Sequence, residues 1–421
     1  MKSIKNIAII GGGPAASTLG ILLQRSGCRV GMYFLPEKAP VVVGESLVPM
    51  IIPMLQDLGI EQDVAAYSIL KPGACFTFDG EETFAFRFAD NPANLPAYSY
   101  NVPRKAFNET LRNAARDAGV QLIEQPARLQ RSGADSIALD AASLQAAGDC
   151  WQGAEPDLIV DAAGRARLLG QLLDIPVQKG RREDVALFAH VDRTELIDPG
   201  YVHTDRLEHG WSWRRPLPER VSLGFVVPAD HAGNSDETPE QQYDRLLRQD
   251  RVVQKFAPDA QRLTPVQRFR NYQSQSTRWC GDNWVMLGDS GGFVDPVFSG
   301  GFVDPVFSSG MLIAMDSAYK LADTLARGKP LSSYETAIRR HLQAWFEIVG
   351  HYYDGRIMAS IKSGKSFAKT TFGKLLVPWI SGHMSSIFSG AAATQPVSMA
   401  LLRILVNHGL QDIDPQHYVV D

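Results

Sequence analysis

The 421-residue sequence lacks the patterns of several protein classes. Its four cysteines are scattered without a C-x-x-C pair, and its histidines show no metal-ligand spacing. We therefore expect a reducing compartment and no metal site. No uninterrupted apolar run is long enough to span a bilayer, and no basic segment with a removable apolar stretch precedes the first strand. These absences predict a cytoplasmic protein with no membrane partner.

The charge balance argues against a nucleic-acid partner. The chain has 42 Lys and Arg against 46 Asp and Glu, a net charge of −4, and it has no Lys/Arg-rich run or RNA-binding motif. Binding to nucleic acid usually requires a basic footprint. Hydrophobic residues make up 45% of the chain, an ordinary globular composition that suffices for two or three cores.

A dinucleotide-binding fingerprint stands near the N-terminus. The apolar run Ile7 to Ile10 predicts a buried strand, and a glycine-rich turn and an apolar helix follow it. The turn reads G-x-G-x-x-A. Gly11 permits the tight turn, Gly13 lets a pyrophosphate approach the backbone, and Ala16 allows close helix–strand packing. We expect phosphates at the helix N-terminus.

One expected part of the fingerprint is missing. An acidic residue at the end of the second strand normally binds the ribose hydroxyls, but Phe34 stands there. Glu37 is a substitute from the following loop, although its direction after Pro36 is unfavourable. We therefore expect weaker or more exchangeable dinucleotide binding than usual.

Two later turns fit the same frame. An apolar run, Trp284 to Leu287, ends in Gly288-Asp289, where many flavoproteins hold the ribityl chain. Another strand-like run, Asp157 to Val160, leads into the turn 161–165, which has an Asp-x-x-Gly pattern. The Asp-x-x-Gly turn resembles a turn of the flavin monooxygenase group.

The segment 291–310 contains the same nine residues, GGFVDPVFS, twice in succession. Each copy gives a Phe-x-x-Pro-x-x-Ser-x-Gly pattern, and Gly310 closes the second copy. The pattern resembles the flavin-proximal turn of flavin-dependent halogenases, so Pro296 and Pro305 are equivalent candidates for a turn against a flavin ring. Only one copy fits a single site before the helix that starts near Met311, so the other must bulge.

Together these segments resemble the flavin-dependent halogenase-like monooxygenases over most of residues 1–350. The further matching parts are Gly44-Glu45-Ser46, Lys71, Arg104 before an amphipathic helix, and Trp211-x-Trp213-x-x-Pro216. The resemblance implies an α/β fold with a Rossmann-like FAD-binding frame of the flavin monooxygenase/halogenase type. An antiparallel β-sheet substrate region and a short C-terminal helical region complete the expected fold.

The expected domains are discontinuous. Residues 1–60, 100–185 and 275–335 form the FAD-binding domain, 61–99 and 186–274 form the β-sheet substrate domain, and 336–421 form the C-terminal helical region. Within the last, 367–395 is rich in Gly, Ser and Thr, and we expect a mobile linker or lid there.

The resemblance also implies roles for individual residues. The loop Gly44-Glu45-Ser46 lies near the flavin ring, and Arg104 lies near the nucleotide. In halogenases, a lysine in the place of Lys71 meets hypohalous acid, either as a hydrogen-bond donor or by becoming a chloramine. The alternatives are that Ser46 only caps a plain loop, that Arg104 is a surface cation and that Lys71 is a solvated lysine.

Trp211 and Trp213 correspond to the two indoles that separate flavin from substrate in halogenases. Two tryptophans on one face of a strand are also a common core arrangement. Arg215 stands where the signature has Ile. Its charge can bind halide, can bind an anionic substrate, or can indicate that the role of the indole pair has changed.

The implied function is FAD-dependent oxygenation, by halogenation or hydroxylation, of an electron-rich aromatic such as indole or tryptophan, phenol or pyrrole, via a flavin hydroperoxide. Chloride or bromide is the halide. No second nucleotide fingerprint occurs, so a separate flavin reductase is expected to supply reduced FAD. The alternatives are hydroxylation of a protein-borne tryptophan during cysteine tryptophylquinone biogenesis in a partner oxidase, a flavin-dependent double-bond reductase, and a non-catalytic flavoprotein scaffold.

The duplication gives a first testable prediction. Deleting residues 300–308 leaves one uninterrupted Phe-x-x-Pro turn. The shortened protein should bind FAD more tightly, because loop length itself costs little closure entropy and the main effect is steric. FAD titration of both proteins measures the difference. Equal or weaker binding after the deletion would show that the second copy is part of the site.

Overall fold

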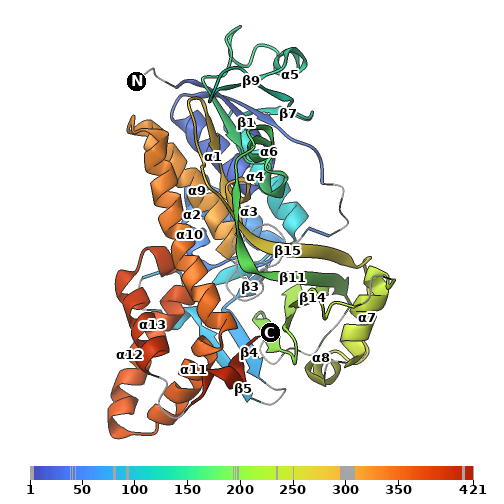
Figure 1. Ribbon diagram of the computed structural model, residues 1–421, viewed down its shortest axis with the longest axis vertical. Coiled ribbons are helices and arrows are strands. Elements are labelled where there is room, and N and C mark those ends of the chain that lie inside the picture. The colour runs from blue at the N-terminus through green and yellow to red at the C-terminus, as the bar shows by residue number, and fades with distance from the viewer. Residues whose placement is uncertain are drawn as a thin grey trace.

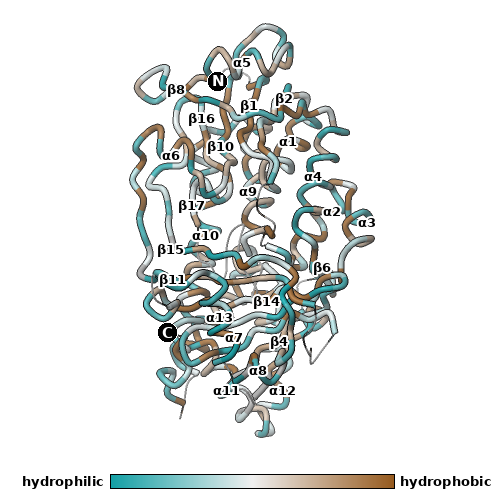
Figure 2. Tube along the Cα trace, turned by 90° about the vertical axis from the view of Figure 1, so that its right-hand side faces the viewer, coloured by the Kyte–Doolittle hydropathy of each residue, from teal (hydrophilic) through white to brown (hydrophobic). Residues whose placement is uncertain are grey.

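The computed structural model describes most of the chain. The described residues are 4–37, 39, 41–42, 44–78, 82–91, 94–192, 194, 196, 199–233, 236–249, 251–293, 309–409 and 413–420. The prolines of the duplicated turn, Pro296 and Pro305, lie outside these ranges. The molecule is elongated, with a parallel sheet at one end and the C-terminal helices toward the other (Figures 1 and 2).

A five-stranded parallel sheet forms the nucleotide-binding frame. Its central strands are buried on both faces, as their continuous apolar sequences predict. Helices α1 (Pro14–Arg25), α4 (Arg104–Asp117) and α9 (Ser309–Ala326) pack together on one face. The strands, in spatial order, are β16 (Trp284–Met286), β10 (Leu158–Asp161), β1 (Asn6–Ile10), β2 (Arg29–Tyr33) and β7 (Gln121–Ile123).

A smaller layer covers the other face of the parallel sheet. Its apolar side chains pack with Tyr33, Trp151 and Trp284 into a separate core. Because β1, β10 and β16 are parallel neighbours, the turns that follow them meet at one edge of the sheet. The elements are the hairpin β8 (Leu129–Arg131) and β9 (Ile137–Leu139), with helices α5 (Ala141–Ala146) and α6 (Leu168–Leu172).

The second large sheet has eight strands, all paired antiparallel except β4 with β12. One face packs against helices α7 (Pro239–Gln249) and α8 (Arg251–Phe256) in its own core. The other face joins the main core of the molecule. The spatial order is β17 (Gly292–Phe293), β15 (Gln267–Ser276), β11 (Val177–Val191), β14 (Arg220–Pro228), β13 (Trp211–Leu217), β12 (Val202–Arg206), β4 (Gly73–Phe78) and β5 (Glu82–Arg87).

A short connecting unit lies between the two sheets in sequence. Helices α2 (Ile52–Leu58) and α3 (Glu61–Ala66) lead into β3 (Ile69–Lys71), which pairs antiparallel with β6 (Ser99–Asn101). Strand β3 therefore ends at Lys71, immediately before the β4–β5 hairpin that the alternating sequence predicts.

The C-terminal region is helical: α10 (Leu331–Tyr353), α11 (Arg356–Phe367), α12 (Thr371–Phe388) and α13 (Pro396–His408). The expected linker at 367–395 is wrong, because most of it forms α12. The Thr370 hydroxyl caps this helix by accepting from the Gly373 amide at 3.0 Å. Within the described ranges, no helix is both long and apolar enough to cross a membrane.

A buried ion pair holds β12 to β13. Arg214 donates from Nε and Nη2 to the two carboxylate oxygens of Asp205, at 3.0 Å each, and both side chains are fully buried. Replacing Asp205 with Asn leaves an uncompensated buried guanidinium and should lower the free energy of unfolding by roughly 3–5 kcal/mol. Urea unfolding measures it. Asp174→Asn, in the exposed pair with Arg131, should cost about 1 kcal/mol at most.

Candidate functional site

The glycine-rich turn after β1 has the shape that a pyrophosphate requires. Gly11 has φ +130°, and a Cβ there would lie 2.1 Å from the Ala162 carbonyl oxygen. A Cβ on Gly13 would meet nothing within 4 Å, so open space lies over the turn. Gly13 caps α1, whose first turn contains no acidic residue, and Ala16 is fully buried. The free helix N-terminus and this space fit a dinucleotide phosphate.

Asp161, at the end of β10, fixes the neighbouring turns. Its Oδ1 accepts from the Ala163 amide and the Ser290 hydroxyl, both at 3.0 Å, and Oδ2 accepts from the Leu169 amide at 2.8 Å. Burial raises the pKa of this carboxyl, although these hydrogen bonds favour its charged form. The Asp-x-x-Gly pattern located the turn, but nothing in the sequence indicated its bond to Ser290.

Charged side chains gather around Gly288-Asp289. Arg104 is buried at 7% exposure, so the surface-cation alternative is wrong, and its Nε donates to Asn108 at 2.9 Å. Burial lowers the pKa of Arg104 to about 10, opposed by the charges of Asp289, Glu37 and Glu45. Burial raises the pKa of Asp289 to about 6, although the charges of Arg165 and Arg104 oppose the shift.

Glu37, the predicted substitute for the missing ribose acid, is held by two side chains of α4. Its Oε1 accepts from Asn108 at 2.8 Å and from Arg112 at 2.7 Å. Burial opposes ionisation, but these hydrogen bonds outweigh it and lower the pKa of Glu37. Phe34 packs directly over Gly12. The carboxylate thus points toward α4 beside the glycine-rich turn, despite Pro36.

The loop Gly44-Glu45-Ser46 is buried against the second sheet. Gly44 has φ +92°, which favours glycine. The Glu45 carboxylate is 2% exposed: its Oε1 accepts from His190 Nε2 on β11 at 2.8 Å, and its Oε2 lies 3.8 Å from Arg215 Nη1 on β13. Arg215, which departs from the expected signature, therefore lies beside a residue of the predicted flavin loop.

Lys71 is 1% exposed, so the solvated-lysine alternative is wrong. Its Nζ donates to the Ser46 hydroxyl at 2.8 Å and to the Leu47 carbonyl at 3.0 Å, and lies 5.4 Å from the centre of the Phe88 ring. Two predicted site segments, far apart in sequence, thus meet through the Lys71–Ser46 hydrogen bond.

Trp211 and Trp213 lie on the face of the second sheet that joins the main core, fully buried, with ring centres 5.7 Å apart. The Trp211 Nε1 is buried without an acceptor among the residues that the structure describes. From Trp213 a row of rings, Phe188 and Phe269, reaches the Arg165 guanidinium. Phe188 and Phe269 therefore connect the indole pair to Arg165, in the turn beside Asp289.

Gly288 and Asp289 form a single 3₁₀ turn after β16, with Gly288 at φ +60°. Gly310 is the second residue of α9 and is buried, so it lies in the helix rather than in a turn. Gly288 lies beside the backbone of α9 at Ala314. The structure thus brings together the ends of β1, β10 and β16 and the start of α9.

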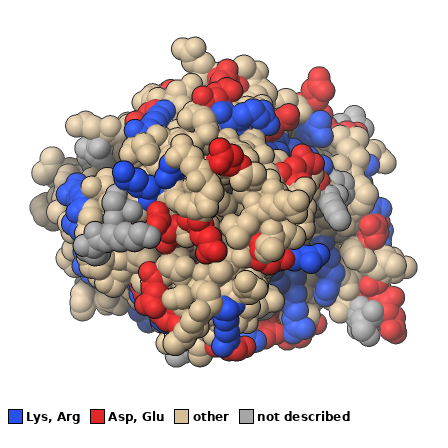
Figure 3. Space-filling model, turned by 90° about the horizontal axis from the view of Figure 1, so that it is seen from above, with Lys and Arg blue, Asp and Glu red and all other residues tan. Residues whose placement is uncertain are grey.

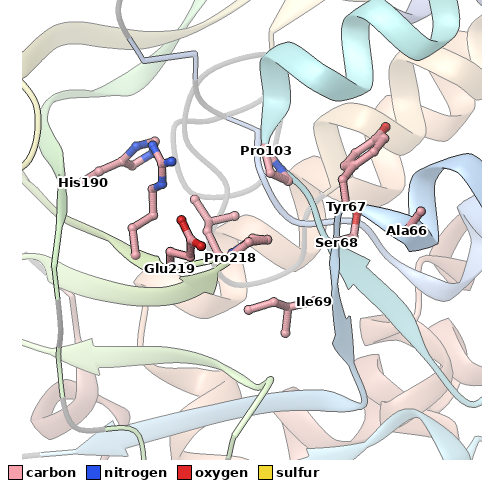
Figure 4. A pocket seen from close by; sticks show the side chains of 10 residues that line it. Ala66, Tyr67, Ser68, Ile69, Pro103, His190, Pro218 and Glu219 are labelled. Carbon is pink, nitrogen blue, oxygen red and sulfur yellow. The ribbon is translucent and has the colours of Figure 1, made fainter.

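A pocket of about 510 Å³ opens beside His190 (Figure 4). Its walls come from the end of α3 and the start of β3 on one side, and from β11 and the β13–β14 turn on the other. Glu219 and His190 lie on the same side of it. Because His190 also contacts Glu45, this pocket borders the buried Glu45–Arg215 pair.

A second, apolar cavity of about 550 Å³ lies between β5 and the C-terminal helices. Phe86 and Phe388 line it and stack at 4.7 Å between ring centres. Phe86 also contacts Phe88, the ring beneath the Lys71 ammonium. Phe86 and Phe88 therefore connect the lining of this cavity to Lys71. No cluster of His, Cys, Asp and Glu suited to a metal occurs among the described residues.

Comparison with known proteins agrees with this geometry. A family model described as tryptophan halogenase matches residues 81–357. The chain is 24% identical over 386 residues to 1H-pyrrole-2-carbonyl-[peptidyl-carrier protein] chlorinase of Pseudomonas fluorescens, covering 83% of each chain. It is 26% identical to tryptophan 2-halogenase of Chondromyces crocatus, covering 84% of this chain and 69% of that one. The structure of flavin-dependent brominase Bmp2 aligns with a TM-score of 0.77 at 20% identity, covering 96% of this chain and 98% of that one.

The raised pKa of Asp289 predicts a pH-dependent stability. Because its folded pKa, about 6, lies above the ordinary aspartate pKa of 3.8, the folded state binds the proton more tightly and loses stability as pH rises through this window. The FAD-free Asp289→Asn protein should therefore melt higher than the parent well above pH 6, and the difference should vanish in acid. Thermal melts across pH test this. The exposed Asp149→Asn should show no such trend; the same trend there would contradict it.

Proposed function

We propose that this chain, which belongs to the tryptophan halogenase family, halogenates an electron-rich aromatic ring of the pyrrole or indole type. Its cofactor is FAD, which supplies the activated oxygen that oxidises chloride or bromide. The open turn at Gly13, the N-terminus of α1 and the buried Arg104 would hold the dinucleotide. Asp289 would receive the ribityl chain, and Glu37 the ribose.

The single observation that carries the proposal is the burial of Lys71 with its ammonium fixed by Ser46 and Leu47. An ammonium removed from water at this place is a directed proton donor. A flavoprotein that only reduces double bonds has no need for it, because no oxidant has to be held away from the flavin.

In the proposed step, the Lys71 ammonium donates a hydrogen bond to the oxygen of hypohalous acid. The halogen–oxygen bond breaks as a ring carbon of the substrate takes the halogen. The ring proton then joins the departing hydroxide to give water. The substrate is oxidised and the halogen is reduced, with no further reactant. The residue's task is to hold and polarise the oxidant, since charge develops on the oxygen that it contacts.

The indole pair and the Glu45 cluster support this role by isolating the oxidant. Trp211 and Trp213 are fully buried and continuous with the aromatic row that ends at Arg165. Large rigid side chains in this place exclude water. The ion pair of Glu45 and Arg215 neutralises the two charges that the loop and β13 bring into the core.

The apolar cavity beside Phe86 is the proposed substrate site. Its volume of about 550 Å³ lies in the range of small-molecule pockets, and its lining suits an aromatic ring. A protein-borne ring is the second candidate, because one relative acts on pyrrole-2-carbonyl attached to a carrier protein.

Replacing Lys71 with Met tests the proposal. With reduced FAD and halide, the variant should consume oxygen at the parental rate but form roughly 10²–10⁴-fold less halogenated product from a panel of pyrroles, indoles and phenols. Mass spectrometry measures the product, and an oxygen electrode measures the uncoupled reaction. Lys329→Met, at an exposed lysine, is the matched control.

Two results would contradict the proposal. Product at the parental rate from the Lys71→Met protein would make the lysine structural. An oxygenated product that forms in the absence of halide would assign hydroxylation instead. FAD binding and the melting temperature of the variant distinguish a lost chemical role from a damaged fold.

A further inference from the structure

Helix α12 is apolar on two opposite faces. Its inner face contributes Val377, Ile380, Met384 and Phe388 to the apolar cavity. Its outer face bears Phe372, Leu375 and Trp379, which are 64%, 75% and 51% exposed. These three positions follow helical spacing i, i+3, i+7 and form one stripe on the side away from the cavity. A helix that is apolar all round is normally buried. The exposed outer stripe is therefore expected to bind a further surface, which would cover it.

The segment around this stripe has an excess of positive charge. Residues 355–411 contain six Lys and Arg side chains and no Asp or Glu, in a chain whose net charge is −4. Arg356 and Arg403 pair with Asp354 and Glu347 outside the segment, so the excess is carried by lysines. Lys362, Lys369 and Lys374 are exposed. The opposite end of the molecule, around the parallel sheet, shows both signs of charge interspersed (Figure 3). The cover of the α12 stripe is therefore expected to be anionic.

The type of cation distinguishes a lipid surface from a protein. Lysine is depleted at protein–protein interfaces, where arginine and aromatic residues are enriched. Lysines beside Trp, Phe and Leu on one helix are instead typical of helices that lie in the plane of a membrane interface, with long side chains reaching the headgroups. Helices α11 and α12 lie at the end of the molecule farthest from β1 and β2 (Figures 1 and 2), where a flat surface can reach them.

We propose that the outer face of α12, bearing Phe372, Leu375 and Trp379 beside Lys369 and Lys374, docks the protein reversibly onto an anionic phospholipid surface. The docked helix has the apolar cavity on its other side. Lipophilic aromatic molecules dissolved in the lipid would then reach the cavity without crossing bulk water. Docking itself is independent of the halogenation reaction.

Flotation of the intact, FAD-loaded protein with vesicles tests the proposal. We expect binding to phosphatidylcholine vesicles containing one third phosphatidylglycerol, weak binding to phosphatidylcholine alone, and loss of binding in high salt. The double variant Lys369→Gln, Lys374→Gln should bind about 30-fold more weakly, since each lysine near an anionic surface contributes ~1 kcal/mol. Leu375→Ser with Trp379→Ser should abolish binding to the mixed vesicles.

Matched controls lie elsewhere on the surface. The double variant Lys179→Gln, Lys329→Gln removes the same charge from exposed sites outside 355–411, and Leu263→Ser removes another exposed leucine, at 53%; both should bind as the parent does. Parental binding by the α12 variants, or an equal loss in the controls, would overturn the proposal. Binding to polyglutamate but not to the vesicles would assign the face to an acidic protein and would also overturn it.

Discussion

The arrangement of the site depends on the interactions of the buried Glu45 carboxylate. It belongs to the loop that follows the parallel sheet, yet its partners, His190 and Arg215, come from two strands of the other sheet. Removing Arg215 would leave the buried Glu45 carboxylate without its cation, at a cost of several kcal/mol. The loop is therefore held against the second sheet, and the Ser46 hydroxyl next to Glu45 is held where Lys71 can reach it.

This arrangement explains why a lysine can be buried at the end of β3. Its ammonium needs acceptors to offset desolvation, and the fixed loop supplies a hydroxyl and a carbonyl, while Phe88 supplies a ring face. Because these fixed groups already hold the Lys71 ammonium in place, its side chain does not have to move when a polar oxidant binds. The same contacts that stabilise the fold thus prepare the proposed chemistry.

Local motifs in the sequence predicted the glycine-rich turn after β1, two tryptophans on one strand and a lysine before the hairpin, because each depends on residue type at short spacing. The roles of these residues in binding and chemistry stay predictions. Side-chain partners between distant segments were not predictable, because no local pattern indicates that Arg215 faces Glu45 or that Ser290 bonds to Asp161. The error at 367–395 had a different cause. Gly, Ser and Thr suggested a linker, but the apolar residues of α12 recur at helical spacing around a cavity, and packing outweighed local propensity. Pro296 and Pro305 stay predictions, since they lie outside the described residues.

Arg215 departs from the family signature, and its contact with Glu45 explains how the cation can be buried. In the signature an apolar residue completes the face of the strand that bears the two tryptophans, and here a cation takes that position without reaching water. A buried guanidinium is tolerated only with a nearby anion, and Glu45 lies close enough to serve. The substitution and the carboxylate therefore form one unit, and the charge is directed at the loop rather than at the indoles. Trp211 and Trp213 pack on each other and are continuous with Phe188 and Phe269, and such an aromatic surface is what the proposed separation of the oxidant from the flavin side requires.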